Sequence, residues 1–148
     1  MKYSRFVKRA SDESIRDFSA LANPIILLVL FLLVFEGTEL KIGIIGLIGV
    51  AVVCYIIKIV FNKERPLKID HKNLFELVQS RSFPSAHSAI IMYTGLSIIA
   101  KVDVFLVDLL FGFLILVVGY SRYHLKKHFV NDIIWGYAIG LVGFILVF

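Results

Sequence analysis

Five long apolar segments constrain this chain more than any other feature of its sequence. We expect helices over residues 21–35, 42–57, 85–100, 104–120 and 133–148, with the second continuing towards Phe61. Apolar residues make up 59% of the chain and the mean hydropathy is +0.87, whereas soluble domains are roughly 45–50% apolar. A soluble domain of 148 residues could not bury that much apolar surface. The segments therefore predict an all-α membrane protein: one membrane-embedded domain, residues 1–148, built as a bundle of about five transmembrane helices.

The polar and charged residues predict how the chain meets the bilayer. Residues 1–20 are basic and polar, and are typical of an interfacial arm that lies on lipid headgroups or stays disordered. The formal net charge is +5, from 16 basic and 11 acidic residues. This balance suits anionic headgroups or phosphate, and the composition makes nucleic acid a poor candidate partner. The sequence indicates no particular protein partner, and the single cysteine, Cys54, excludes an intramolecular disulfide.

Residues 121–132 form a dense polar stretch between two of the apolar segments. It contains Arg122, His128 and Asp132, and such side chains beside membrane-length apolar segments are costly to hold without a function. If this part is helical, His128 and Asp132 are four residues apart and lie on one face. The carboxylate could then accept a hydrogen bond from one imidazole nitrogen, leaving the other nitrogen free to act as a base or nucleophile.

Two further polar clusters fall on the same side of a five-span bundle. Lys58 and Arg65 are seven residues apart, nearly two helical turns, so we expect both cations on one helix face roughly 10 Å apart. Residues 84–88 open the third apolar segment, and a helix amino terminus there offers unpaired N–H groups to an anion. Arg122 adds a fork of donors that suits phosphate oxygens. The three clusters together predict a phosphate site.

These clusters resemble the three signature motifs of the type 2 phosphatidic acid phosphatases. The matching residues are Lys58-(six residues)-Arg65-Pro66, Pro84-Ser85-Ala86-His87 and Ser121-Arg122-(five residues)-His128-(three residues)-Asp132. That superfamily includes membrane lipid phosphatases, glucose-6-phosphatase and the vanadium haloperoxidases. The order, internal spacing and gaps of the motifs all fit over residues 58–132, which would form the catalytic core. The chain departs from the family at Ala86, where glycine is usual, and in having about five spans where six are common.

The resemblance implies a role for each motif residue. His128 would attack phosphorus and form a phosphohistidine, with Asp132 orienting it. His87 would protonate the leaving oxygen and then deprotonate the water that clears the intermediate. The phosphate-binding groups would be Lys58, Arg65, Ser85, the Ala86 amide and Arg122. No metal or cofactor is required, and the physics agrees, because phosphoryl transfer mainly needs clustered cations and preorganised donors.

The predicted function is a membrane phosphatase that hydrolyses a lipid phosphomonoester or diphosphate. Small members of the family resemble polyprenyl diphosphate phosphatases, which makes a polyprenyl diphosphate the first choice of substrate. Phosphatidate or phosphatidylglycerophosphate is the alternative. A different class of protein, a non-catalytic lipid-binding or scaffold protein of the membrane, would keep the same pocket without turnover. In a rival interpretation, three side chains spaced four residues apart on one helix face would ligate a metal: His124, His128 and Asp132.

Sidedness receives two opposite predictions for this integral membrane protein of the plasma membrane or its equivalent. The side that bears the motifs carries eleven lysines and arginines even without Lys58, Arg65 and Arg122, whereas the other side has Lys41 and Lys101. Loop charge therefore puts the site on the cytoplasmic face. Bacterial members of the family mostly place it outside the cytoplasm. Residues 67–80 would cover the headgroup as a lid.

Overall fold

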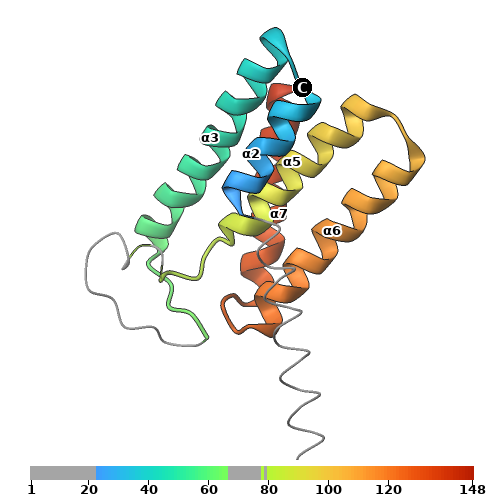
Figure 1. Ribbon diagram of the computed structural model, residues 1–148. Helices are drawn as coiled ribbons and strands as arrows, with labels where there is room; N and C mark the ends of the chain where they lie inside the picture. The colour runs from blue at the N-terminus through green and yellow to red at the C-terminus, as the bar shows by residue number, and fades with distance from the viewer. Residues whose placement is uncertain (1–22, 67–77, 79) are drawn as a thin grey trace, which may run out of the picture.

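The structure, a computed structural model, describes residues 23–66, 78 and 80–148. It contains α2 (Pro24–Val34), α3 (Gly37–Phe61), α5 (Ala86–Val102), α6 (Phe105–His124) and α7 (Val130–Val147), with no strand among the described residues (Figure 1). The prediction of an all-α fold with five helices is confirmed. The predicted basic arm and almost all of the predicted lid lie outside the described residues.

Three of the helices are long and apolar enough to cross a membrane: α3, α6 and α7. The other two, α2 and α5, are shorter apolar helices. Large apolar side chains such as Leu33, Leu106 and Leu146 point outward and are 70–80% exposed. A surface of this kind is stable only against lipid, so the protein is an integral membrane protein, as the sequence predicts.

One predicted connection is wrong. We expect a polar turn over residues 36–39 from the sequence, but α3 already begins at Gly37 and includes Thr38 and Glu39. Gly37 has a φ of +57°, a conformation that glycine adopts without steric cost, so the chain reverses between Phe35 and Gly37.

Helix α5 is the centre of the bundle. It packs against the other four helices, most extensively against α7, and α3 and α6 contact it without contacting each other. Its buried face is rich in small and polar residues, including Ser88, Thr94, Gly95 and Ser97. The hydroxyl of Tyr93 donates to the carbonyl of Gly43 at 2.9 Å, which fixes α5 against α3.

The approach of α7 to α5 depends on two glycines. A Cβ at Gly136 would lie 2.5 Å from the carbonyl oxygen of Ser85, and one at Gly140 would lie 2.3 Å from that of Ala89. Small residues four apart allow two helix backbones to come this close in a membrane. The first turns of α5 and α7 therefore lie side by side, at the end of the bundle where α3 and α6 finish (Figure 1).

Candidate active site

Lys58 lies just before the end of α3, and Arg65 lies just after it. Lys58 lies in the last turn, is 5% exposed, and donates from Nζ to the carbonyl of Arg81 at 2.7 Å. The helix ends at Asn62, which has a left-handed conformation, so the predicted helical spacing of the two cations is wrong. The chain nevertheless returns Arg65 close enough to act electrostatically on Lys58.

The amino terminus of α5 presents the second group of predicted residues. Ser85 is the N-cap, and its hydroxyl oxygen accepts from the amide of Ser88 at 3.4 Å and from the hydroxyl of Ser88 at 2.8 Å. Ala86 and His87 open the first turn, where backbone N–H groups have no partner within the helix. The amide of Ser85 donates to the carbonyl of Asp132 at 2.9 Å, which ties this turn to α7.

The end of α6 folds back to bring His128 beside Arg122. The carbonyl of Arg122 accepts from the amide of Lys127 at 3.1 Å and from the amide of His128 at 3.2 Å. This reversal requires Lys126 to adopt a φ of +52°. Arg122 and His128 are each 3% exposed, so the loop buries a guanidinium and an imidazole together.

His128 has a different partner from the one that the sequence suggests. It precedes α7, whose N-cap is Phe129, so it does not share a helix face with Asp132. Its Nδ1 lies 2.6 Å from the carbonyl oxygen of Ser82. A carbonyl oxygen can only accept, so this hydrogen bond places the ring proton on Nδ1 and leaves the Nε2 lone pair free.

Asp132 is enclosed by donors and does not touch the imidazole through any hydrogen bond found among the described residues. Its Oδ1 accepts from Lys63 Nζ at 2.6 Å, and its Oδ2 accepts from the hydroxyl of Ser82 and from the amide of Phe129 at 2.9 Å. The carboxylate is completely buried, whereas the Lys63 side chain is 40% exposed. The ammonium lies 4.7 Å from the centre of the Phe129 ring.

Sequence reasoning missed Lys63 and Ser82. The available signal was Asp132 itself: a carboxylate beside an apolar segment needs several donors to be buried. Sequence alone does not say which of the neighbouring hydroxyls and lysines supply them.

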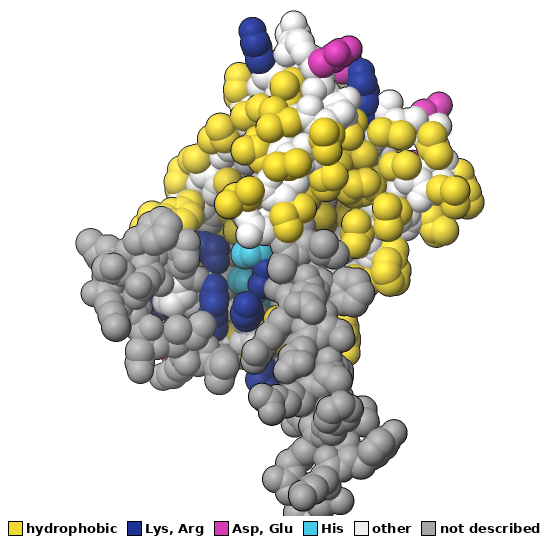
Figure 2. Space-filling view, viewed as in Figure 1, with side chains coloured by type: hydrophobic (Ala, Val, Ile, Leu, Met, Phe, Trp, Pro, Cys, Tyr) yellow, Lys and Arg dark blue, Asp and Glu magenta, His cyan; other side chains and the backbone are white. Residues whose placement is uncertain are grey.

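The electrostatics of the site favour an anion. Burial is the main reason that the pKa of His128 lies well below its usual 6.5, and Lys58, Arg65 and Arg122 lower it further. The positive charges of Arg122, Lys127 and Lys58 also interact electrostatically with the ring of His87. Figure 2 shows lysine, arginine and histidine side chains gathered below the apolar body, and we refer to the buried site that these side chains form as the recess. Cations buried together repel each other, so this recess is suited to a ligand with more than one negative charge.

The arrangement does not favour the rival metal site. His124 is exposed, with its ring 5.8 Å from that of Tyr120, whereas His128 and Asp132 are buried. Within residues 23–66, 78 and 80–148, no three histidine, cysteine, aspartate or glutamate side chains are placed to hold a metal ion together.

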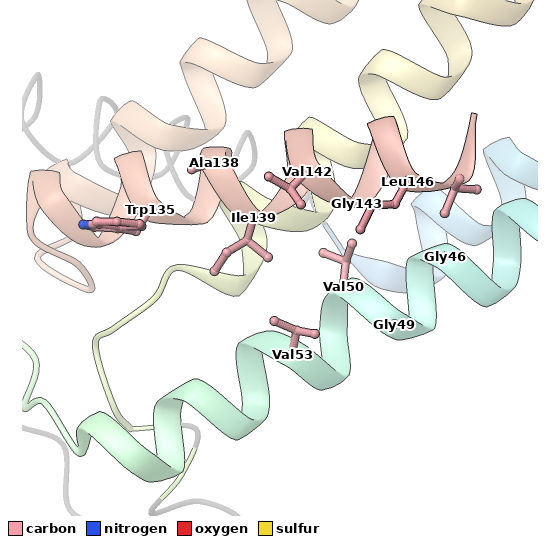
Figure 3. Close-up of a pocket in the computed structure, with 11 residues that line it drawn as sticks. Gly46, Gly49, Val50, Val53, Trp135, Ala138, Ile139, Val142, Gly143 and Leu146 are labelled. Atoms are coloured by element: carbon pink, nitrogen blue, oxygen red, sulfur yellow. The ribbon is translucent and has the colours of Figure 1, made fainter.

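An apolar groove runs from the neighbourhood of this site along α3 and α7. It has a volume of about 400 Å³ and is lined by Gly49, Val50 and Val53 of α3 and by residues of α7 from Trp135 to Val147 (Figure 3). The Trp135 ring, at one end, lies 6.4 Å from the ring of Phe83. Phe83 in turn lies 5.8 Å from Lys63 Nζ, so the groove and the polar recess are neighbours.

The fold and site define a class: a helical membrane protein with a cationic, histidine-containing recess at the end of the bundle. The family model described as PAP2 superfamily matches residues 40–148, and the chain belongs to this family, which confirms the resemblance of the three motifs.

The chain is also similar to a solved structure, that of a transmembrane PAP2-type phosphatidylglycerolphosphate phosphatase from Bacillus subtilis. The TM-score is 0.73 at 21% identity, and the match covers 92% of this chain and 74% of the other. None of the curated proteins matches the chain.

Proposed function

We propose that this protein is a membrane lipid phosphatase that works through a phosphohistidine on His128. The observation that carries the proposal is the position of His128: its Nδ1 is held by the carbonyl of Ser82, and three cations surround the ring. A buried, neutral imidazole with a free Nε2 lone pair is a nucleophile, and the cations fit the charge that spreads over the equatorial oxygens of a transferring phosphoryl group.

The reaction has two steps. In the first, Nε2 of His128 forms a bond to phosphorus while the bond from phosphorus to the leaving oxygen breaks, and His87 donates a proton to that oxygen. A bound phosphate dianion favours the protonated form of His87, which supplies this proton. In the second, His87 takes a proton from a water that attacks the phosphohistidine, and inorganic phosphate leaves with the ring of His128 free again.

Five groups are proposed to hold the equatorial oxygens: Lys58, Arg65, Arg122, Ser85 and the amide of Ala86. Ser85 fits this role because its oxygen already accepts two hydrogen bonds from Ser88, which leaves its own O–H to donate elsewhere. Ala86 keeps the backbone donor that a glycine would supply at the same helix terminus. Asp132 is proposed to act on His128 from behind, and no metal ion has a part in this mechanism.

The groove between α3 and α7 supports a lipid as the substrate. It is apolar along its length, opens to the surface that faces lipid, and ends beside the recess. A hydrocarbon chain entering sideways from the bilayer can lie there while the phosphate lies among the cations. A polyprenyl diphosphate is the first proposed substrate. Phosphatidylglycerophosphate or phosphatidate is the second, and the fold shared with the B. subtilis enzyme favours it.

The test is phosphate release from a panel of lipid mono- and diphosphates by the protein in detergent, with His128→Ala as the matched variant. We expect release by the wild-type protein, at least about 1,000-fold slower release by the variant, and no loss with a chelator. The preferred lipid of the panel identifies the substrate. Equal release by both proteins would reject the phosphohistidine, and no release from any lipid would favour a non-catalytic lipid-binding protein.

A further inference from the structure

Lys63 lies between the motif residues Lys58 and Arg65, and the family motif gives it no role. It nevertheless makes a direct contact with the buried acidic group of the site, since its Nζ lies 2.6 Å from Asp132 Oδ1. Its own backbone carbonyl accepts from the amide of Ser82 at 2.7 Å. Lys63 therefore holds Asp132 through its side chain and Ser82 through its main chain.

Ser82 is fixed on every side by these contacts. Its amide is bound by Lys63, its hydroxyl donates to Asp132 Oδ2, and its carbonyl accepts the Nδ1 proton of His128. The residue is completely buried. Any shift of Ser82 would move the oxygen that sets the tautomer and the orientation of the imidazole.

We propose that Lys63 and Ser82 are positioning residues for His128, and that Asp132 acts on His128 through Ser82. This inference rests on the proposed function, because it assigns a role relative to the proposed nucleophile. We refer to Lys63, Ser82 and Asp132 as the positioning network.

The charge of Lys63 has a second consequence for the reaction. Paired with Lys63, the carboxylate of Asp132 is balanced, and the neutral imidazole of His128 lies next to an uncharged carbonyl. Without the ammonium, the buried carboxylate would lose its ion-pair partner, and a nearby negative charge that is less well balanced favours the imidazolium. A protonated His128 has no lone pair on Nε2 and cannot attack phosphorus.

The charged and titratable groups that face His128 come from all the elements around it. The ring interacts with Lys58 of α3, Arg65 of the following segment, His87 of α5 and Arg122 of α6. It is linked through Ser82 to Asp132 of α7 and to Lys63. All of these except Asp132 and the neutral His87 are cations. Removing Lys63 weakens the positive potential at His128 and leaves the carboxylate of Asp132 without its ion-pair partner. Both effects favour protonation of the His128 ring.

The experiment compares Lys63→Met with Lys63→Arg, using a short-chain phosphate that is hydrolysed by the wild-type protein. Methionine keeps an apolar stem against the Phe129 ring, and arginine keeps the charge. We expect Lys63→Met to lower kcat about tenfold with KM changed less than about twofold, and to move the acid limb of the kcat/KM profile up by about one pH unit. Lys63→Arg should restore the acid limb of the kcat/KM profile to its wild-type position. Lys101→Met, which removes a lysine charge at the opposite end of the bundle, should leave the acid limb unmoved.

Ser82→Ala provides a second measurement, because it removes the hydroxyl and retains the carbonyl that His128 uses. We expect kcat to fall and KM to stay near the wild-type value. An acid limb unchanged in Lys63→Met, or moved equally in Lys63→Arg, would overturn the role of the ammonium. A wild-type kcat in Ser82→Ala would overturn the path through Ser82. Activity retained by His128→Ala would reject the proposed function instead, so the two failures are distinguishable.

Discussion

The two ends of the helical bundle use charge in opposite ways. At one end, Lys58, Arg122 and Asp132 are buried where four helices meet. At the other end, Lys101 and Glu39 form an ion pair with both side chains exposed. Exposed pairs contribute little to stability, whereas like charges buried together destabilise the folded chain unless a ligand neutralises them. The charges of the first end therefore have a functional explanation that the second end does not need.

The largest expected effect comes from replacing a lysine by methionine at each end of the bundle, which tests the comparison directly. Lys58→Met should slow phosphate release about 100- to 1,000-fold, since it removes one cation from the phosphoryl group. The ligand-free protein should keep or increase its thermal stability, because a buried ammonium beside other cations destabilises the folded chain when no ligand neutralises it. Lys101→Met should leave release within about twofold and cost at most about 1 kcal/mol of stability.

The measurements are initial rates with one lipid phosphate and thermal denaturation in the same detergent. Equal rates for Lys58→Met and the wild-type protein would contradict the functional explanation. A large loss of stability in Lys58→Met would show instead that the buried ammonium holds the fold through its hydrogen bond to Arg81.

The next effect concerns the contact that brings the first turns of α5 and α7 together. Gly136→Ala places a Cβ 2.5 Å from the carbonyl oxygen of Ser85, so we expect a loss of about 1–3 kcal/mol in stability and a lower rate. Gly112→Ala on α6 is the matched control, since nothing lies within 4 Å of its Cβ. It should be neutral or stabilise by up to about 1 kcal/mol. Denaturation midpoints and rates check both, and a fully stable, active Gly136→Ala would refute the close approach.

The third prediction concerns the contribution of His128 to the pH dependence of stability. Its folded-state pKa lies well below the unfolded value of about 6.5, chiefly because it is buried. Below about pH 6.5, His128 therefore binds a proton in the unfolded chain that it does not bind in the folded chain. This residue alone lowers the free energy of unfolding by about 1.4 kcal/mol per pH unit. This contribution is fully present above the unfolded pKa and is lost as the pH drops.

Denaturation of the wild-type protein, His128→Asn and His124→Asn between pH 7.5 and 5 measures this effect. Asparagine at position 128 can still donate to the Ser82 carbonyl but does not titrate. We expect the acid destabilisation to be smaller in His128→Asn and unchanged in His124→Asn, because His124 is exposed. Equal slopes for all three proteins would mean that His128 is not buried in its neutral form.

The sequence predicts the helices of this protein better than it predicts the contacts between their side chains. The apolar segments predict the five helices because a bilayer leaves the backbone few alternatives. The motifs predict that Lys58, Arg122 and His128 meet, and the structure brings them together. The prediction that Arg65 lies on the same helix face as Lys58 was wrong, because α3 ends before Asn62.

The partners of Asp132 could not be predicted, for a physical reason. A buried carboxylate needs donors, but it accepts them from any direction and from any residue type that carries one. Lys63 and Ser82 lie 69 and 50 residues away along the chain, and the packing of α7 against both α3 and α5 brings them to it. Periodicity within a helix carries no information about such pairs.

The smallest expected effect separates the recess from the groove beside it. Gly49 lines the groove and its Cβ would meet nothing within 4 Å, so Gly49→Phe starts a side chain in open space and adds a ring to the groove. We expect kcat/KM for a long-chain lipid phosphate to fall about tenfold, while that for a short-chain analogue stays near the wild-type value. Gly112→Phe adds the same ring at an equally open glycine away from the groove, and should change neither value. If both chain lengths respond alike to Gly49→Phe, the hydrocarbon chain lies elsewhere, and the polar recess alone accounts for recognition of the substrate.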